Sequence, residues 1–215
     1  GCMFLKMLES KFGRQKFDVF LNGYFNHFKW KTVNTEEFIT YLDENLLKKN
    51  PKILVNYNEW IYNIGLPVNC PKIISKELAR VKEMANKVNV HKSVKDIDTA
   101  GFTTQHWMYL LRNLNADSVK GIMSEIDTIY HLTASTNSEI QCDWYLLSIS
   151  ADYQAAMPYI QNYLMNVGRR KFLQPIYSRL VQTPEGKSFA LKVFEKTGPR
   201  YHSVSRTTIN EILNH

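Results

Sequence analysis

The sequence of 215 residues has few cysteines and no long apolar run, and both shortages exclude structural classes. No apolar run approaches the roughly 18 residues that a membrane-spanning helix requires. The cysteines are far apart and odd in number, which argues against a disulfide framework and against a zinc site built on cysteine pairs. We therefore expect three isolated thiols, at Cys2, Cys70 and Cys142.

The chain also lacks the short motifs that accompany common catalytic sites. It contains no H-E-x-x-H, C-x-x-C, Walker or G-x-S-x-G sequence. No two histidines have the spacing of zinc ligands on a helix, so each is expected to be structural. The histidines are His27, His91, His106, His131, His202 and His215. Taken alone, the sequence indicates no catalytic residue and no metal ligand.

Positive charge is in excess, but it is not concentrated. The formal net charge is +7 and the isoelectric point is about 9.2. Lysine and arginine are scattered along the whole chain, whereas nucleic-acid-binding proteins more often gather them on one face. We therefore expect no nucleic-acid partner and no membrane partner.

Apolar residues recur at helical spacing from the first residues onward, and residues 2–28 are predicted to be helical. Gly13 predicts a break between two helices within this range. No Ser, Thr, Asp or Asn precedes the first helix as a cap. An uncapped start of this kind indicates a chain that begins in the middle of a longer protein.

A second helical segment and a linker follow. Asn34 and Glu37 have the spacing of a capping box, which predicts a helix that begins beside them. One glycine and two prolines then fall within residues 65–71. Because no regular element tolerates that density of breakers, we predict a linker at about 65–75.

Beyond the linker the chain is predicted to be a series of amphipathic helices. They are expected at about 75–92, 103–113, 116–132, 137–151, 152–167, 171–182, 186–197 and 203–213. Helices of this length joined by short loops are typical of stacked αα-hairpins. We predict an all-α fold, a right-handed solenoid of the armadillo or HEAT kind, although no fixed repeat period is present.

Two other residue types carry predictions about the helices. The four tryptophans lie in or beside apolar stripes, so core packing is favoured over stacking on a ligand. They are Trp30, Trp60, Trp107 and Trp144. Pro158 lies inside an otherwise regular helical pattern, and we expect it to bend the helix or to mark a 3₁₀ turn.

Three cations follow a glycine in the stretch NVGRRKFLQP, residues 166–175. They fall where a new helix is expected to begin, although that end of a helix already carries positive potential. In one interpretation Gly168 ends the preceding helix, the arginines contact its last carbonyls and Lys171 is a solvated surface residue. In the other, Arg169 and Lys171 bind a carboxylate, with help from the free N–H groups of the next helix. Arg170 would then face away.

This stretch resembles the C-terminal domain of the leukotriene A-4 hydrolase and aminopeptidase B family of zinc aminopeptidases. That family has a Gly-Arg-x-Lys-Phe core followed by a proline. Further segments resemble the family in the same order along the chain: FKWKTVNTEEFITYL, NEWIYNIGLPVNCPKI, NSEIQCDWYLLSI and YHSV. The resemblance covers almost the whole chain, with Val68 standing where the family's linker has a second proline.

The resemblance implies a division of the chain into parts. Residues 1–64 would be the last helices of a thermolysin-like catalytic domain, 65–75 the linker, and 76–215 the α-helical C-terminal domain. Gly1 matches the glycine of the family's Tyr-Glu-Lys-Gly stretch, which contains the transition-state tyrosine. The zinc ligands, the general-base glutamate and the tyrosine would therefore precede this chain. Zinc belongs to the parent protein, and we expect this fragment to bind none and to be inactive.

The resemblance also implies roles for the cations. Carried over by matching position, Arg169 would bind the free carboxylate of a short peptide substrate and Lys171 would assist. Arg170 stands at the variable position between them. The expected partners are a peptide substrate and the missing N-terminal and catalytic domains of the same chain. A cytoplasmic location is favoured, although an export signal would lie upstream. The alternative is a helical-repeat module that binds a protein partner without catalysis.

Overall fold

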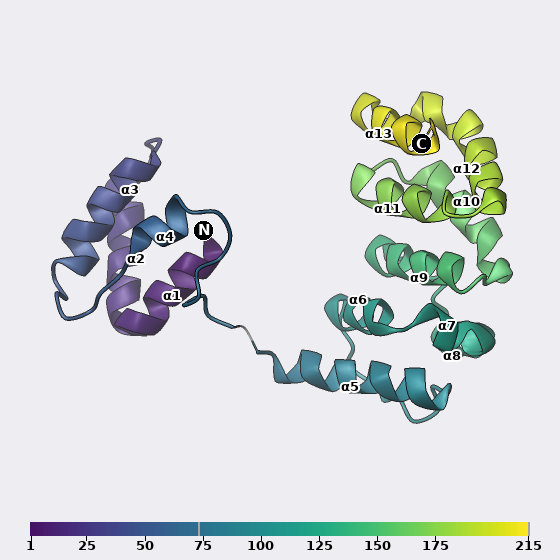
Figure 1. Cartoon of the computed structure of the whole chain (residues 1–215), viewed down its shortest axis with the longest axis horizontal. Helices are drawn as coiled ribbons and strands as arrows, with labels where there is room; N and C mark the ends of the chain where they lie inside the picture. Colours follow the sequence, from purple (N-terminus) through teal and green to yellow (C-terminus); the bar gives the residue numbers. More distant parts are fainter. Residues whose placement is uncertain (73, 215) are drawn as a thin grey trace. The chain divides into compact units, whose positions relative to one another are not determined.

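The structure is a computed structural model that describes residues 1–72 and 74–214. Ile73 of the predicted linker and His215 at the end of the predicted C-terminal domain lie outside the described residues. The described residues form helices and no strand, which confirms the predicted all-α class (Figure 1). The chain divides into two compact units, unit 1 at Gly1–Ile74 and unit 2 at Ser75–His215.

Unit 1 begins with two helices that meet at a glycine. They are α1 (Cys2–Phe12) and α2 (Arg14–Phe28). Gly13 between them has a φ of 79°, a left-handed backbone that glycine adopts without steric cost. The predicted break at Gly13 is therefore confirmed.

The rest of unit 1 depends on a well-formed helix cap. It contains α3 (Thr35–Leu42), the π-helical turn η1 (Asp43–Leu47) and α4 (Tyr57–Ile61). The Glu37 N–H donates to Asn34 Oδ1, and the Asn34 N–H donates to Glu37 Oε2, both at 2.9 Å. Two donors that the helix leaves unpaired are thus satisfied, and the predicted capping box is confirmed. The sequence pattern does not predict α4, since five residues are too few to show a helical period.

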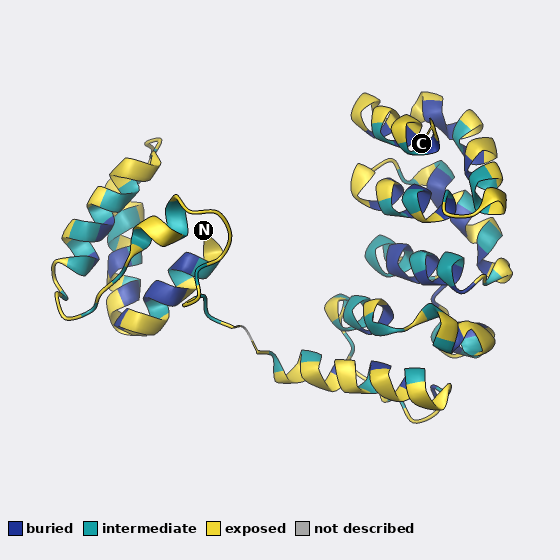
Figure 2. Ribbon diagram, viewed as in Figure 1, coloured by how far each residue is buried: buried dark blue, intermediate teal, exposed yellow. Residues whose placement is uncertain are grey.

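The core of unit 1 is small and rich in phenylalanine. Its buried residues come from α1, α2, α3 and η1, and the ribbon of Figure 2 shows buried stretches in dark blue within this unit. They are Phe4, Met7, Leu8, Phe12, Phe17, Phe20, Leu42 and Leu46. These side chains have the helical spacing that the sequence pattern uses, so the amphipathic faces of the helices are on the expected sides.

Unit 2 holds the remaining helices. They are α5 (Lys76–His91), α6 (Thr104–Asn113), α7 (Ala116–Val119), η2 (Lys120–Ile122), α8 (Met123–Tyr130), α9 (Ser138–Ser150), η3 (Gln154–Ala156), α10 (Met157–Asn166), α11 (Arg170–Leu180), α12 (Pro184–Thr197), η4 (Gly198–Arg200) and α13 (Ser203–Asn214). Among the residues described, no helix has both the length and the apolar character needed to traverse a bilayer.

Successive helices of unit 2 stack upon one another. α5 contacts α6, α6 contacts α9, α9 contacts α11, and α11 contacts α13 (Figure 1). The helix pair α10 and α12 lies beside this stack, and α12 also contacts α11. α9 lies in the middle, where Trp144 and Tyr145 are almost fully buried. Neighbours on both sides explain why its residues are more uniformly buried than those of an ordinary amphipathic helix. The right-handed armadillo-like form stays a prediction.

Two predicted helices begin or break differently from their sequence pattern. The helix expected at 116–132 is interrupted by the 3₁₀ turn η2, and its last part ends at Tyr130. The helix expected at 152–167 starts only at Met157, after the 3₁₀ turn η3. Pro158 lies in the first turn of α10, where its missing N–H leaves no hydrogen bond unmade. The 3₁₀ turn η3 directly precedes α10, and the proline itself lies in the α-helix and not in the turn.

The tryptophan prediction holds for some side chains and fails for one. Trp144 is fully buried, and Trp60 and Trp107 pack at the edges of core clusters. Trp30 is 98% exposed, so its predicted core role is wrong. It follows the C-terminal end of α2 with a φ of 64°, a left-handed turn conformation that carries the ring away from the helix's apolar face.

Candidate functional site

The three cations of NVGRRKFLQP lie at the junction between α10 and α11. Val167 and Arg169 both have extended backbone, with ψ of 120° and 123°. Gly168 directly follows the C-cap Val167, as expected for the end of α10, but it lacks the positive φ of a left-handed glycine cap. Its carbonyl instead accepts a hydrogen bond from Ser205 Oγ at 3.1 Å, which ties the junction to α13.

Arg169 and Lys171 gather around one aromatic ring. The Arg169 guanidinium carbon is 5.7 Å from the centroid of the Phe172 ring, and the Lys171 ammonium nitrogen is 5.2 Å from it. Phe172 itself is only 5% exposed. Cations at such distances are attracted to the face of the ring, which holds both in one neighbourhood. Arg170 is exposed and contacts neither this ring nor an acidic side chain among the described residues.

Lys171 has a partner that the sequence analysis does not assign. Its ammonium forms an ion pair with Glu139 Oε1 of α9. The two side chains are partly exposed, at 54% for Lys171 and 30% for Glu139. Glu139 belongs to the NSEI segment that carries part of the family resemblance, which is the one sequence signal that points to it. Its contact with residue 171 comes from the stacking of α9 on α11, and no local pattern reveals that.

The backbone at this junction adds positive potential. The Phe172 and Leu173 N–H groups donate to the Arg169 carbonyl, at 2.9 and 3.1 Å. The N–H groups of residues 170 and 171 have no such intrahelical acceptor. No acidic residue occupies the first turn of α11. An anion near Arg169 would therefore meet two free amide donors as well as the cations.

The floor beneath the cations is rigid and chemically inert. Phe172 packs edge-on against Tyr163, and the Tyr163 hydroxyl donates to the Ser138 carbonyl at 2.9 Å. Cys142 Sγ lies 3.9 Å from the Phe172 carbonyl oxygen. Burial raises the pKa of the Cys142 thiol to about 12, so it stays protonated at neutral pH and is no nucleophile. The floor supports the cations and contributes no reactive group.

No group of three or more His, Cys, Asp or Glu side chains among the described residues is close enough to hold a metal ion. The groups gathered at the junction between α10 and α11 are instead those that bind an anion.

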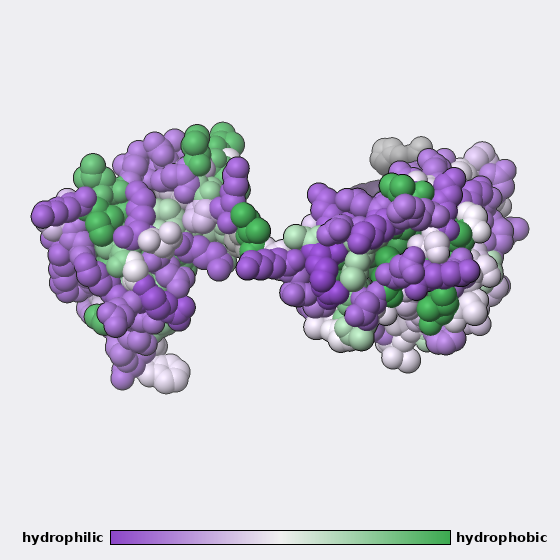
Figure 3. Space-filling model, turned by 90° about the horizontal axis from the view of Figure 1, so that it is seen from below, coloured by the Kyte–Doolittle hydropathy of each residue, from purple (hydrophilic) through white to green (hydrophobic). Residues whose placement is uncertain are grey.

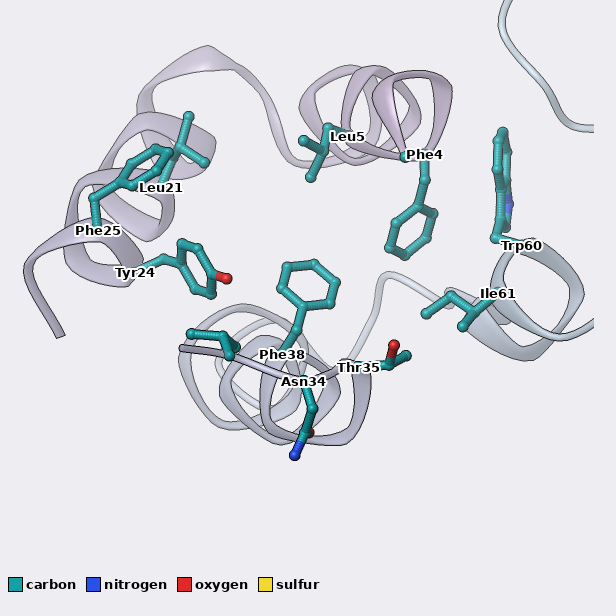
Figure 4. A pocket seen from close by; sticks show the side chains of 12 residues that line it. Phe4, Leu5, Leu21, Tyr24, Phe25, Asn34, Thr35, Phe38, Trp60 and Ile61 are labelled. Atoms are coloured by element: carbon teal, nitrogen blue, oxygen red, sulfur yellow. The ribbon is translucent and has the colours of Figure 1, made fainter. Parts of the chain in front are cut away.

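Unit 1 has a hollow of about 520 Å³, shown in Figure 4. Aromatic side chains from three helices and α4 surround it, among them Phe4, Tyr24, Phe38 and Trp60. No Asp, Glu, Lys, Arg or His lines it. This hollow can hold apolar groups, and Tyr24 is the one ionisable side chain among its described lining residues.

A smaller groove of about 260 Å³ crosses α6, α9 and α11 of unit 2. Arg112, Asp143, Ser150 and Arg179 supply its polar atoms. Arg112 Nε lies 2.8 Å from Asp143 Oδ2 without the alignment of a hydrogen bond, and Arg179 donates to Ser150 Oγ at 2.7 Å. Its two arginines already have partners, unlike Arg169.

The fold and the junction define an all-α domain that presents a pair of cations at a helix start. Residues 102–213 match the family model described as leukotriene A4 hydrolase, C-terminal. The match covers more than half of the chain, and the chain belongs to this family. The recognition made from the sequence is thereby confirmed.

Similar proteins extend the likeness over nearly the whole chain. A leucine aminopeptidase 2 of Yarrowia lipolytica is 29% identical over 99% of this chain and 35% of its own length. A leucine aminopeptidase 2 of Candida albicans is 31% identical over 100% of this chain and 37% of its own length. The structure of yeast LTA4 hydrolase in complex with bestatin has a TM-score of 0.84 and 22% identity, over 99% of this chain and 38% of that one. The chain thus spans little more than a third of these relatives, and the structural likeness shows a shared fold.

Proposed function

We propose that this chain is the C-terminal part of a zinc aminopeptidase, in which Arg169 and Lys171 bind the free carboxylate of a short peptide. The observation that carries the proposal is the gathering of both cations around the Phe172 ring at the start of α11. Arg169 has no ion pair or side-chain hydrogen bond with any described residue. Its planar fork is therefore free to hold a carboxylate by two hydrogen bonds.

Under this proposal the chain's own residues position the substrate. Zinc, held by the part of the parent protein that the relatives have beyond the matched third, would activate the water that attacks the peptide bond. Arg169, Lys171 and the two free amides of α11 hold the other end of the peptide. Such an anchor lowers the cost of orienting the scissile bond.

We also propose that residues 1–64 are the end of the catalytic domain, that 65–75 are a linker, and that 76–215 are the C-terminal domain. The support is the surface of unit 1, on which Figure 3 shows several hydrophobic groups among the hydrophilic ones. Most of the large exposed apolar side chains described in the chain belong to unit 1. Those within residues 1–64 are Val19, Phe25, Trp30, Leu54, Tyr62 and Ile64, and those within the proposed linker are Leu66, Val68 and Ile74. Exposed apolar surface of this extent is typical of a region that another part of the protein covers.

The test of the carboxylate role is Arg169→Ala in the complete enzyme, with Arg170→Ala as the matched control. A charge-assisted hydrogen bond contributes about 1.5–3 kcal/mol. We therefore expect Arg169→Ala to lower kcat/KM for free-carboxylate tripeptides by about 10- to 100-fold, and to affect C-terminally amidated peptides much less. Arg170→Ala should change both classes little. Equal losses for the two classes with Arg169→Ala would refute the carboxylate role.

The chain of 215 residues is expected to have no peptidase activity by itself. Under this proposal the zinc ligands belong to another part of the parent protein, and carboxylate binding alone cleaves no bond. The measurement is hydrolysis of aminoacyl-anilides by the purified chain, with and without added zinc. Turnover that copurifies with the chain and disappears with a chelator would overturn this expectation.

A further inference from the structure

Glu139 is an acidic residue inside a site proposed for an acidic ligand. It forms the ion pair with Lys171 that lies beside Arg169 at the Phe172 ring. The cluster of Arg169, Lys171 and Glu139 therefore has a net charge of +1 rather than +2. A site built only to maximise attraction for anions would not include a carboxylate.

The position of Glu139 is fixed by its own helix. Its N–H donates to Asn137 Oδ1 at 3.0 Å, and Asn137 Nδ2 donates to Thr104 Oγ1 of α6 at 3.0 Å. Glu139 lies in the first turn of α9, where the helix dipole favours negative charge. The backbone of Glu139 is thus held in place by α9 and α6, and the contact of its carboxylate among the described residues is the ion pair with Lys171.

Lys171 has the longer and more flexible side chain of the pair, and the ion pair with Glu139 restrains it. A lysine side chain has several rotatable bonds and an ammonium group with three donors. The Glu139 contact uses one donor and keeps the ammonium within 5.2 Å of the ring that Arg169 also contacts. The remaining donors stay available to a ligand at the Phe172 ring, which Arg169 also approaches.

We propose that Glu139 is a positioning and specificity residue of the carboxylate site, and this inference rests on the proposed function. It holds Lys171 beside Arg169, and it limits the site to one net positive charge. The site then accepts peptides whose C-terminal residue bears one carboxylate. Peptides that end in Asp or Glu bring a second carboxylate close to Glu139 and bind less well, because like charges repel at short range.

The test uses the complete enzyme and tripeptides that differ only in the last residue, alanine or aspartate, with free and amidated C-termini. Glu139→Gln keeps the size of the side chain and removes its charge. We expect it to raise the kcat/KM of the Asp-ended peptide relative to the Ala-ended one by about fivefold, mainly through KM. Glu139→Asp should restore most of the original preference.

Glu185→Gln is the matched control, since Glu185 occupies the equivalent position in the first turn of α12 and forms no ion pair with any described residue. The Glu185→Gln variant loses the same interaction with a helix dipole. It should leave the ratio of kcat/KM between the Asp-ended and Ala-ended peptides unchanged. An unchanged ratio with Glu139→Gln overturns the inference. If Arg169→Ala still separates free from amidated peptides in that case, the carboxylate site stands and only the role of Glu139 fails. If Arg169→Ala does not separate them, the proposed function fails first.

A second measurement does not depend on activity. N-acetylated tripeptides ending in alanine or aspartate are titrated into the 215-residue chain, and NMR follows the backbone amides of residues 170 and 171. We expect the Ala-ended peptide to shift these amides at lower concentration, and Glu139→Gln to remove that difference. Equal titration curves for both peptides with the unsubstituted chain would contradict the proposed selectivity.

Discussion

At the scale of single residues, Asp143 shows how burial and pairing compete. Its side chain is 7% exposed on α9, and Arg112 lies 2.8 Å away. Burial raises the pKa of Asp143 above its ordinary value of 3.8, and this effect outweighs the guanidinium of Arg112, which lowers the pKa. Half of Arg112 is in solvent, so its charge is screened and the buried carboxylate is only partly compensated.

This raised pKa predicts a pH dependence of stability. The folded chain holds the Asp143 proton more tightly than the unfolded chain, so the stabilising contribution is full below pH 3.8 and is lost as pH rises through the folded-state pKa. In the Asp143→Asn variant the side chain at this position cannot ionise. The free energy of unfolding of the variant should therefore decline less than that of the unsubstituted protein between about pH 4 and about pH 7. Urea unfolding followed by tryptophan fluorescence measures this. A parallel decline in both proteins would show that Asp143 does not contribute.

At the scale of elements, Gly186 fixes the entry into α12. Its N–H donates to Thr183 Oγ1 at 3.1 Å, which caps the helix. A Cβ added at Gly186 would lie 2.2 Å from the Leu180 carbonyl oxygen, closer than any real contact. The turn between α11 and α12 therefore requires glycine for space, since the φ of Gly186 is not in the left-handed region.

Gly186→Ala is expected to destabilise the protein although alanine is the better helix former. Propensity alone would stabilise the helix by about 1 kcal/mol, but the clash with backbone should cost more, for a net loss of about 1–3 kcal/mol. Gly121→Ala is the control, because nothing lies within 4 Å of a Cβ at that exposed position. Thermal unfolding by circular dichroism compares the two. Equal melting temperatures for the Gly186→Ala and Gly121→Ala variants would show that the turn between α11 and α12 can relax to accept a Cβ.

Most elements were predictable because their signals are local. The glycine at position 13 and the capping box at Asn34 mark boundaries within a few residues, and the structure confirms both. Trp30 and the short helix α4 were not predictable, since each depends on how chain segments meet in space. Glu139 illustrates the same limit at the site. The cations are adjacent in sequence, but their acidic partner lies 32 residues away on another helix.

At the scale of the whole molecule, the two units serve different purposes in the proposed enzyme. Unit 2 has an extensive core of its own and holds the proposed carboxylate site entirely within α9, α10 and α11. Unit 1 has a smaller core and much exposed apolar surface. An anchor on a rigid helical stack tolerates variation elsewhere in the protein, because its geometry is set by local packing.

The upstream coding sequence separates this proposal from the alternative, a helical-repeat interaction module. An H-E-x-x-H helix encoded there favours the enzyme.

The difference between the units predicts how each behaves alone. Residues 75–215 should fold as an independent domain, since 141 residues with a continuous buried cluster suffice for a stable core. Residues 1–74 should be much less stable and should bind a hydrophobic dye, because small domains bury a lower fraction of their surface. Circular dichroism melting and dye fluorescence on the two pieces and the whole chain test this. The melting transition of residues 75–215 should reappear in the whole chain at a similar temperature. If residues 75–215 were unfolded when isolated, their stability would depend on unit 1. The carboxylate site would then not belong to a domain that folds by itself.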